Sequence, residues 1–158
     1  MAQVMSFKLK GIKRYSPTQL LSANLYLENT KIATCNGGET ISLIWTKKGT
    51  LLQAEITQLI NDYTEKCSTN ITKKENLDSS PLLQIVKELL TLNEMEQYLM
   101  NQRKKYINSV LVLYSFTDKA DEVYYYGTWG AELEEKEVNK VAPNSFKVFR
   151  ELSDFSIK

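Results

Sequence analysis

The alternation of apolar and polar residues in the first quarter of the chain predicts three β-strands. Residues 7–13 alternate between apolar side chains and lysine as far as Gly11, where the pattern slips. This predicts a strand with a β-bulge at the glycine. Residues 23–27 and 31–35 alternate again on either side of a short polar turn, an arrangement typical of a β-hairpin.

The glycine turn at residues 36–38 is followed by residues 41–45, which predict a fourth short strand. The period then lengthens to that of a helix, for which Thr50 is the expected N-cap. One face of this helix is apolar, formed by Leu52, Ile56, Leu59, Ile60 and Tyr63. Residues 67–78 are polar and predict a loop.

Two more helices are predicted in the middle of the chain. Ser80 and Pro81 are a capping residue and a first-turn proline, so a helix is expected to begin there. Asn93 predicts the cap of a separate third helix, which ends near Ile107.

The last third of the chain returns to strands. Residues 110–114 are almost continuously apolar, which predicts a strand in the centre of a sheet. After a turn at 118–121, residues 122–126 predict a returning strand and residues 127–130 a loop. Residues 146–150 predict the last strand.

Strands, then helices, then strands favour an α+β fold over an alternating one. We expect an antiparallel or mixed sheet of five to seven strands with about three helices on one face, in the order β-β-β(-β)-α-α-α-β-β-β. A chain of 158 residues, 42% of them apolar, is the usual size of one domain and long enough to bury a core. The sequence therefore predicts a single α+β domain over residues 1–158.

The absence of histidine narrows the chemistry. It removes Ser-His and Cys-His nucleophile pairs, and the usual general base near neutral pH. Cys35 and Cys67 follow no CxxC spacing, so we expect free thiols. No pattern indicates a catalytic residue, a metal site or a cofactor. We expect a protein that is not an enzyme, and leave open a carboxylate- or metal-dependent enzyme.

Charge and hydropathy limit the partners. The net charge of +1 disfavours both a dedicated nucleic-acid binder and an acidic DNA mimic. No apolar run approaches the roughly 18 residues that a membrane span needs. The first ten residues lack the apolar core of a signal peptide. A cytoplasmic protein without a membrane partner is the simplest expectation.

Aromatic residues are the first candidate binding site. They are Tyr124, Tyr125, Tyr126 and Trp129, together with Trp45. Exposed aromatic side chains anchor protein interfaces or stack on bases. The alternative is that every second one fills the core while the others lie on a half-exposed face, because successive side chains of a strand point to opposite faces and a strand hides at most one of them.

Basic residues near the N-terminus are the second candidate site. Lys8, Lys10, Lys13 and Arg14 would bind the phosphates of a nucleotide, with tyrosines stacking on the base. A solvated strand face, with lysines that protect a sheet edge, explains the same residues without a ligand.

Residues 7–13, 23–38 and 147–155 resemble the opening strand, the hairpin and the closing strand of a family of small accessory proteins of phages and mobile elements. The chain departs from that family in its shorter turn, where only Asn36-Gly37-Gly38 remains. The resemblance implies no reaction and no catalytic residues. It implies a phage accessory protein, cytoplasmic in the host cell, of a kind that binds and disables host factors.

These observations lead to one leading hypothesis and two alternatives. The leading one is a non-enzymatic protein that sequesters or inhibits a host defence factor by protein–protein interaction. The alternatives are a nucleotide or small-ligand sponge and, less favoured by the net charge, a nucleic-acid-binding module. The sequence leaves a homo-oligomer open, because it does not show which sheet edge is exposed.

Overall fold

The structure is a computed structural model that describes residues 1–16, 19–38, 40–66, 80–115, 125–130 and 144–157. The fold is α+β, as predicted, but the described strands form two sheets where the sequence predicts one. The chain forms two compact units. The N-terminal unit is Ala2–Leu90 with Ser156–Lys158, and the C-terminal unit is Met1 with Thr91–Phe155. The assignment of a single domain stays a prediction.

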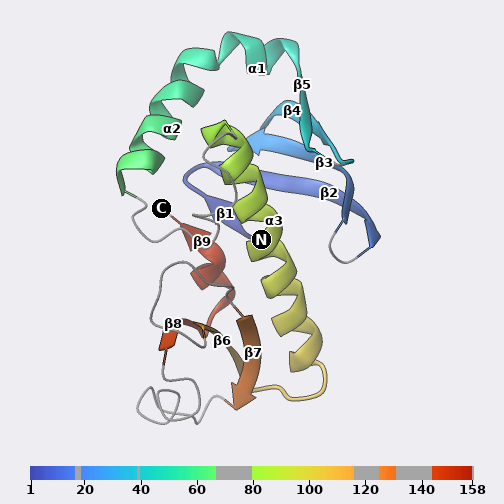
Figure 1. The fold of residues 1–158 in the computed structure, drawn as a ribbon, viewed down its shortest axis with the longest axis vertical. Helices are drawn as coiled ribbons and strands as arrows, with labels where there is room; N and C mark the ends of the chain where they lie inside the picture. Colours follow the sequence, from blue (N-terminus) through green and yellow to red (C-terminus); the bar gives the residue numbers. More distant parts are fainter. Residues whose placement is uncertain (17–18, 39, 67–79, 116–124, 131–143, 158) are drawn as a thin grey trace. The chain divides into compact units, whose positions relative to one another are not determined.

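A six-stranded sheet organises the N-terminal unit, in the order β5-β4-β3-β2-β1-β9 (Figure 1). Its strands are β1 (Gln3–Val4), β2 (Phe7–Ser16), β3 (Gln19–Leu27), β4 (Thr30–Asn36), β5 (Ser42–Trp45) and β9 (Ser156–Ile157). Neighbours from β1 to β5 pair antiparallel, and β9 pairs parallel with β1. The sequence does not predict β1 or β9, because two residues are too few to show a period.

The predicted bulge in β2 is present, and it changes which side chains face the core. Phe7 and Leu9 are buried before the bulge. Gly11 has a φ of 61°, which favours glycine, and the pairing with β3 shifts just after it. Beyond the shift, Arg14 reaches the inner face, where its Nη2 donates to the Leu90 carbonyl at 3.2 Å. The bulge therefore reverses the inward and outward positions of β2.

Two helices follow β5 where the sequence predicts one, namely α1 (Lys47–Leu51) and α2 (Gln53–Lys66). The expected N-cap at Thr50 is wrong. Thr46 is the N-cap, since its side chain accepts the N–H of Gly49. Two residues of the predicted apolar face, Ile56 and Tyr63, are fully buried, as expected.

A single long helix, α3 (Pro81–Arg103), replaces the last two predicted helices. It begins at the predicted proline, and Ser80 Oγ accepts the N–H of Leu83 at 3.3 Å. The expected break at Asn93 is wrong. Leu92 and Met95, on either side of Asn93, are both buried and continue the apolar spacing of the helix. Their burial stabilises a continuous helix more than a cap at Asn93 would stabilise a separate one.

The C-terminal unit contains a three-stranded antiparallel sheet in the order β7-β6-β8. Its elements are β6 (Ser109–Ser115), β7 (Tyr125–Gly130), β8 (Asn144–Phe149) and a 3-10 turn, η1 (Leu152–Phe155). The strand at 110–114 is central, as predicted. The loop predicted at 127–130 is wrong, because these residues continue β7 and pair with β6. The predicted loop at 67–78, the turn at 118–121 and strand residues 122–124 lie outside the described residues.

Each unit has its own apolar core. The largest buried side chains of the N-terminal unit are Phe7, Leu25, Ile32, Ile56, Tyr63, Ile85 and Leu89. Those of the C-terminal unit are Leu92, Met95, Leu99, Phe149 and Phe155, of which the last two stack with ring centroids 4.5 Å apart. In the N-terminal unit, the first part of α3, up to Leu90, crosses in front of β2 and β3 (Figure 1). Among the described residues, no helix has the length and apolar character to cross a membrane.

Candidate functional site

Strand β5 forms one edge of the six-stranded sheet. It pairs with β4 on one side, in an unshifted register from Asn36 opposite Ser42 to Ala33 opposite Trp45. In the described part of the chain, no strand lies on its other side. This edge is the first candidate for a binding site, because an unpaired edge offers hydrogen-bonding groups to another chain.

The backbone groups that face away from β4 can be identified. The N–H of Thr46 donates to the carbonyl of Ile32 at 2.9 Å, so these opposed residues form a hydrogen-bonded pair. Bonded and non-bonded pairs alternate along an antiparallel ladder. Ile44 is therefore bonded to β4, whereas Leu43 and Trp45 direct their N–H and C=O groups outward. Among the described residues, no backbone group outside the sheet bonds these outward groups.

The side chains of β5 include none of the features that usually protect an edge. The strand is Ser-Leu-Ile-Trp, without charge, proline, glycine or bulge. Ile44 is 60% exposed, and Trp45 is half-buried. Leu51, shortly after the strand in α1, is 83% exposed. The edge therefore combines free backbone groups with exposed apolar side chains.

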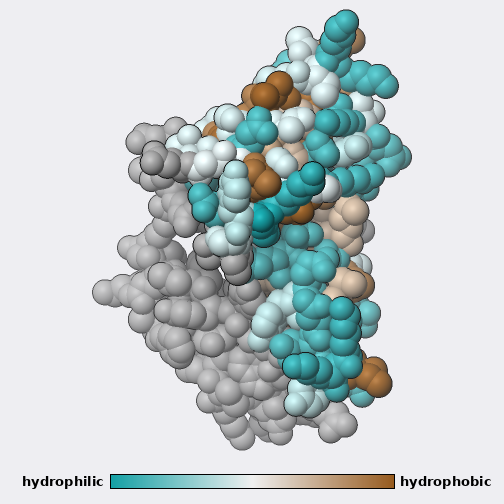
Figure 2. All heavy atoms as spheres, turned by 90° about the vertical axis from the view of Figure 1, so that its right-hand side faces the viewer, coloured by the Kyte–Doolittle hydropathy of each residue, from teal (hydrophilic) through white to brown (hydrophobic). Residues whose placement is uncertain are grey.

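Apolar exposure alone does not single out this site. Figure 2 shows one face of the molecule, on which the coloured hydrophobic side chains stand mostly apart among hydrophilic ones. Scattered apolar residues are normal on protein surfaces. What distinguishes β5 is that its apolar side chains accompany unpaired backbone groups.

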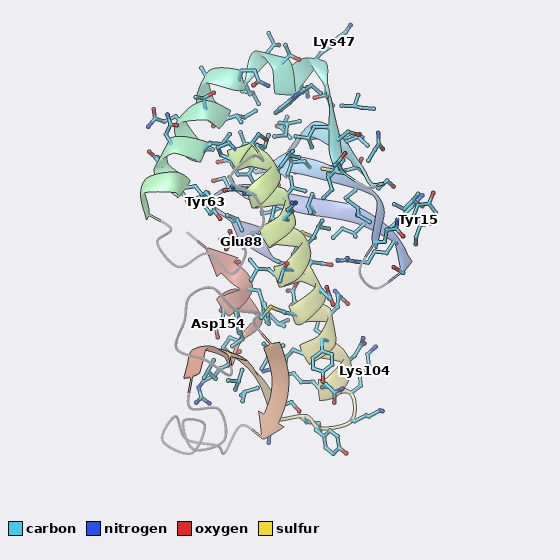
Figure 3. All side chains as sticks on the ribbon, viewed as in Figure 1. Tyr15, Lys47, Tyr63, Glu88, Lys104 and Asp154 are labelled. Carbon is cyan, nitrogen blue, oxygen red and sulfur yellow. The ribbon has the colours of Figure 1, made fainter. Side chains whose placement is uncertain are left out.

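The end of β5 is held firmly. The Thr46 hydroxyl lies 3.0 Å from the Lys31 carbonyl and 3.1 Å from that of Ile32, and it accepts the Gly49 N–H at 3.0 Å. A Cβ added at Gly49 would meet the Ile32 carbonyl oxygen at 2.0 Å, so only glycine fits this approach of α1 to β4. Lys47 projects outward at the start of α1 (Figure 3). A partner strand would thus dock on a preformed edge.

The predicted basic set does not form one cluster. Lys8 and Lys10 precede the bulge, and Lys10 lies over the Tyr26 ring with its Nζ 4.6 Å from the centroid. Lys13 is exposed. Arg14 is on the opposite face of the sheet, bonded to α3, so its role is to tie the helix to the strand.

The predicted aromatic cluster is only partly described. Tyr124 lies outside the described residues. The backbones of Tyr125, Tyr126 and Trp129 belong to β7, where Tyr126 is opposite Leu113 in β6. The side chains of these three residues are not described, so their role as an interface stays a prediction. Trp45 is the one member placed with its surroundings, at the β5 edge.

The buried polar groups of the interior are engaged with one another. Tyr63 in α2 donates to the carboxylate of Glu88 in α3, and the two side chains point toward each other in Figure 3. In the C-terminal unit, the Met1 ammonium pairs with the buried Glu96 at 2.7 Å. Burial raises the pKa of the Cys35 thiol to about 11, which leaves it protonated and a poor nucleophile near neutral pH.

No constellation in the described residues supports catalysis. They contain no group of three or more Cys, Asp or Glu side chains that would hold a metal ion. Comparison of the chain with protein-family models, curated proteins and solved structures gives no significant match.

Sequence reasoning did not single out Ile44 and Thr46 at the β5 edge, or Tyr26 beside Lys10. The place of β5 at the edge depends on the strand order, which the hydropathy pattern does not contain.

Proposed function

We propose that the protein is a non-enzymatic binding protein that captures an extended segment of a partner protein by strand addition at β5. The observation that carries this proposal is the unprotected β5 edge, with outward backbone groups at Leu43 and Trp45. Strand addition uses such groups for affinity and the alternate side chains for specificity.

The side chains around β5 indicate the composition of the partner segment. Ile44 is exposed beside the edge and would contact an apolar side chain of the added strand. Lys47 and Lys48 are both exposed just beyond the strand and favour an acidic residue at that end. The expected segment is therefore extended and apolar at its centre, with an acidic flank.

The resemblance to phage accessory proteins supports a host protein as the partner. Occupying the segment would sequester or inhibit that protein without any chemical step. A nucleotide sponge is less well supported, because Arg14 is on the other face of the sheet from Lys8 and Lys10 and the predicted phosphate cluster is not assembled.

The test uses two substitutions at one residue. Leu43→Pro removes an outward N–H without touching a β4 bond, and Leu43→Ala removes the same side-chain packing but keeps the N–H. A surface-displayed library of short random peptides, selected on the native protein, supplies the probe. We expect selected peptides to bind Leu43→Ala almost as well as the native protein and Leu43→Pro at least about five-fold more weakly.

Circular dichroism melting of both variants checks that the fold is kept. Should Leu43→Pro not fold, Ile44→Lys is the second variant, since it changes only an exposed side chain of the edge. Equal binding of the selected peptides to the native protein and to the folded edge variants would contradict the proposal.

A further inference from the structure

The outer face of the six-stranded sheet gathers three lysines around one tyrosine. The pairing registers place Tyr26 of β3 directly between Lys8 of β2 and Lys31 of β4. Lys10 lies two residues along β2, with its Nζ 4.6 Å from the centroid of the Tyr26 ring. Residues directly opposite one another share a face of the sheet, so all four side chains lie on the same side.

The strands themselves supply no carboxylate to balance these lysines, and Glu28 lies in the turn between β3 and β4. Strands β1 to β5 contain no Asp or Glu. In the described residues, no ion pair is formed by Lys8, Lys10 or Lys31. With strands about 4.8 Å apart, Lys8 and Lys31 stand about 10 Å from each other on either side of Tyr26. Like charges gathered on one face destabilise a sheet, and an anionic ligand would relieve that cost.

We propose that this face binds single-stranded nucleic acid. An aromatic ring on which a base stacks, flanked by cations that neutralise the backbone, is the combination that single strands require. Lys10 occupies a face of the Tyr26 ring in the free protein, and a base would take that place while the ammonium moves to a phosphate. The lysines would thus bind the phosphates of the nucleic-acid backbone, and the Tyr26 ring would favour unpaired bases.

The shape of the face disfavours two related ligands. A mononucleotide needs a concave pocket that buries most of its surface, whereas Lys8, Lys10, Tyr26 and Lys31 are half-exposed on an open sheet. A duplex keeps its bases stacked within the helix and would leave Tyr26 unused. The near-zero net charge of the chain does not oppose the proposal, because the lysines are concentrated on one face.

This inference is independent of the strand-addition site. It uses the outer face of β2, β3 and β4, whereas strand addition uses the outward edge of β5. The edge variant Leu43→Pro therefore should not change nucleic-acid binding, and failure of one proposal leaves the other standing.

The experiment is fluorescence anisotropy with labelled oligothymidine and oligouridine, titrated at several salt concentrations. Three neutralised phosphates predict a slope of about −2 in log K against log salt, since a single strand contributes about −0.7 for each. Lys8→Gln and Lys31→Gln should each reduce the slope by about 0.7. Tyr26→Leu should weaken binding about five- to one-hundred-fold, and Tyr26→Phe should stay near the native affinity.

Two controls separate this site from general charge. Lys105→Gln removes an exposed lysine of the C-terminal unit and should leave the affinity unchanged. Poly-glutamate, a polyanion without bases, should bind at least about ten-fold more weakly than the oligonucleotides. The proposal is overturned if Tyr26→Leu and Tyr26→Phe bind alike, if Lys105→Gln costs as much as Lys31→Gln, or if poly-glutamate binds equally well.

Discussion

Two exposed edges of the six-stranded sheet, the uncovered part of β2 and the whole of β5, are very different. From Leu9 onward, β2 has no described strand on the side away from β3, because β1 pairs only with Phe7 and Lys8. This stretch carries two lysines, an arginine, a bulge at Gly11 and three register shifts. At the other edge, β5 is regular and uncharged, with Ile44 exposed.

Under the strand-addition proposal, this difference determines which edge would accept an incoming strand. Charge, bulges and irregular register are the features that stop a sheet edge from pairing with another chain. The structure has all three on the exposed part of β2 and none on β5. If solubility alone shaped both edges, β5 would be expected to carry protection as well, and the strand-addition proposal accounts for the lack of it in the described residues.

The largest effect is expected at the junction that holds β5 in place. Gly49→Ala places a methyl group 2.0 Å from the Ile32 carbonyl oxygen, so α1 and β4 must separate. We expect a loss of about 3 kcal/mol or more in the free energy of unfolding, measured by urea denaturation. Lys48→Ala, an exposed neighbour in the same helix, is the control and should change it by less than about 0.5 kcal/mol. Equal losses would show that the close approach is not needed.

A second, intermediate effect depends on pH. Cys35 in β4 lies opposite Leu43 of β5, and burial raises its pKa from 9.0 to about 11. The unfolded thiol ionises near pH 9, while the folded one keeps its proton until about pH 11. The contribution of the protonated Cys35 thiol to the free energy of unfolding is complete below pH 9 and is lost as the pH rises to about 11. This contribution is at most about 2–3 kcal/mol.

Denaturation of the native protein and of Cys35→Ala, followed from pH 8 to 11.5, isolates this contribution. The difference between their stabilities should shrink steadily through that range. A constant difference would mean that the thiol is not shielded from water in the folded protein.

The smallest effect on stability is expected when a charged residue is placed on the β5 edge or removed from the β2 edge. Ile44→Lys gives β5 the charge that protects β2, and Lys13→Ile removes a charge from β2. Both side chains are exposed, so each stability should stay within about 0.5 kcal/mol of native. Ile44→Lys should lose the selected peptides, and Lys13→Ile should raise self-association in analytical ultracentrifugation. The comparison fails if Ile44→Lys still binds the peptides.

The sequence predicted best those strands and helix ends that are determined by residues close together in the chain. The strands predicted at 7–13, 23–27 and 31–35 from their alternating pattern, with a bulge at Gly11, appear within β2, β3 and β4. The helix start at Pro81 also follows from its neighbours in sequence. The cap predicted at Thr50 is wrong because the helix begins earlier, with Thr46 as its N-cap. The cap predicted at Asn93 is wrong because the burial of Leu92 and Met95 keeps α3 intact through Asn93.

The candidate sites could not be predicted in full, because they depend on the pairing of strands that are far apart in the sequence. Trp45, Lys8 and Lys10 were predicted as binding residues, but Tyr26 was not, because its position between lysines arises from two strand registers. Arg14 was grouped with the lysines because the reversal of facing at Gly11 depends on the exact pairing with β3. The division of the strands between two sheets likewise follows from pairings between residues far apart in sequence.

The most direct test of the docking edge is amide hydrogen exchange by NMR, on the free protein and with a selected peptide. In the free protein, the N–H groups of Leu43 and Trp45 should exchange much faster than those of Ile44 and Thr46, which bond to β4. The peptide should slow Leu43 and Trp45 and leave Ile44 and Thr46 unchanged. Slow exchange of all four in the free protein would mean that the β5 edge is already covered, which would contradict the account.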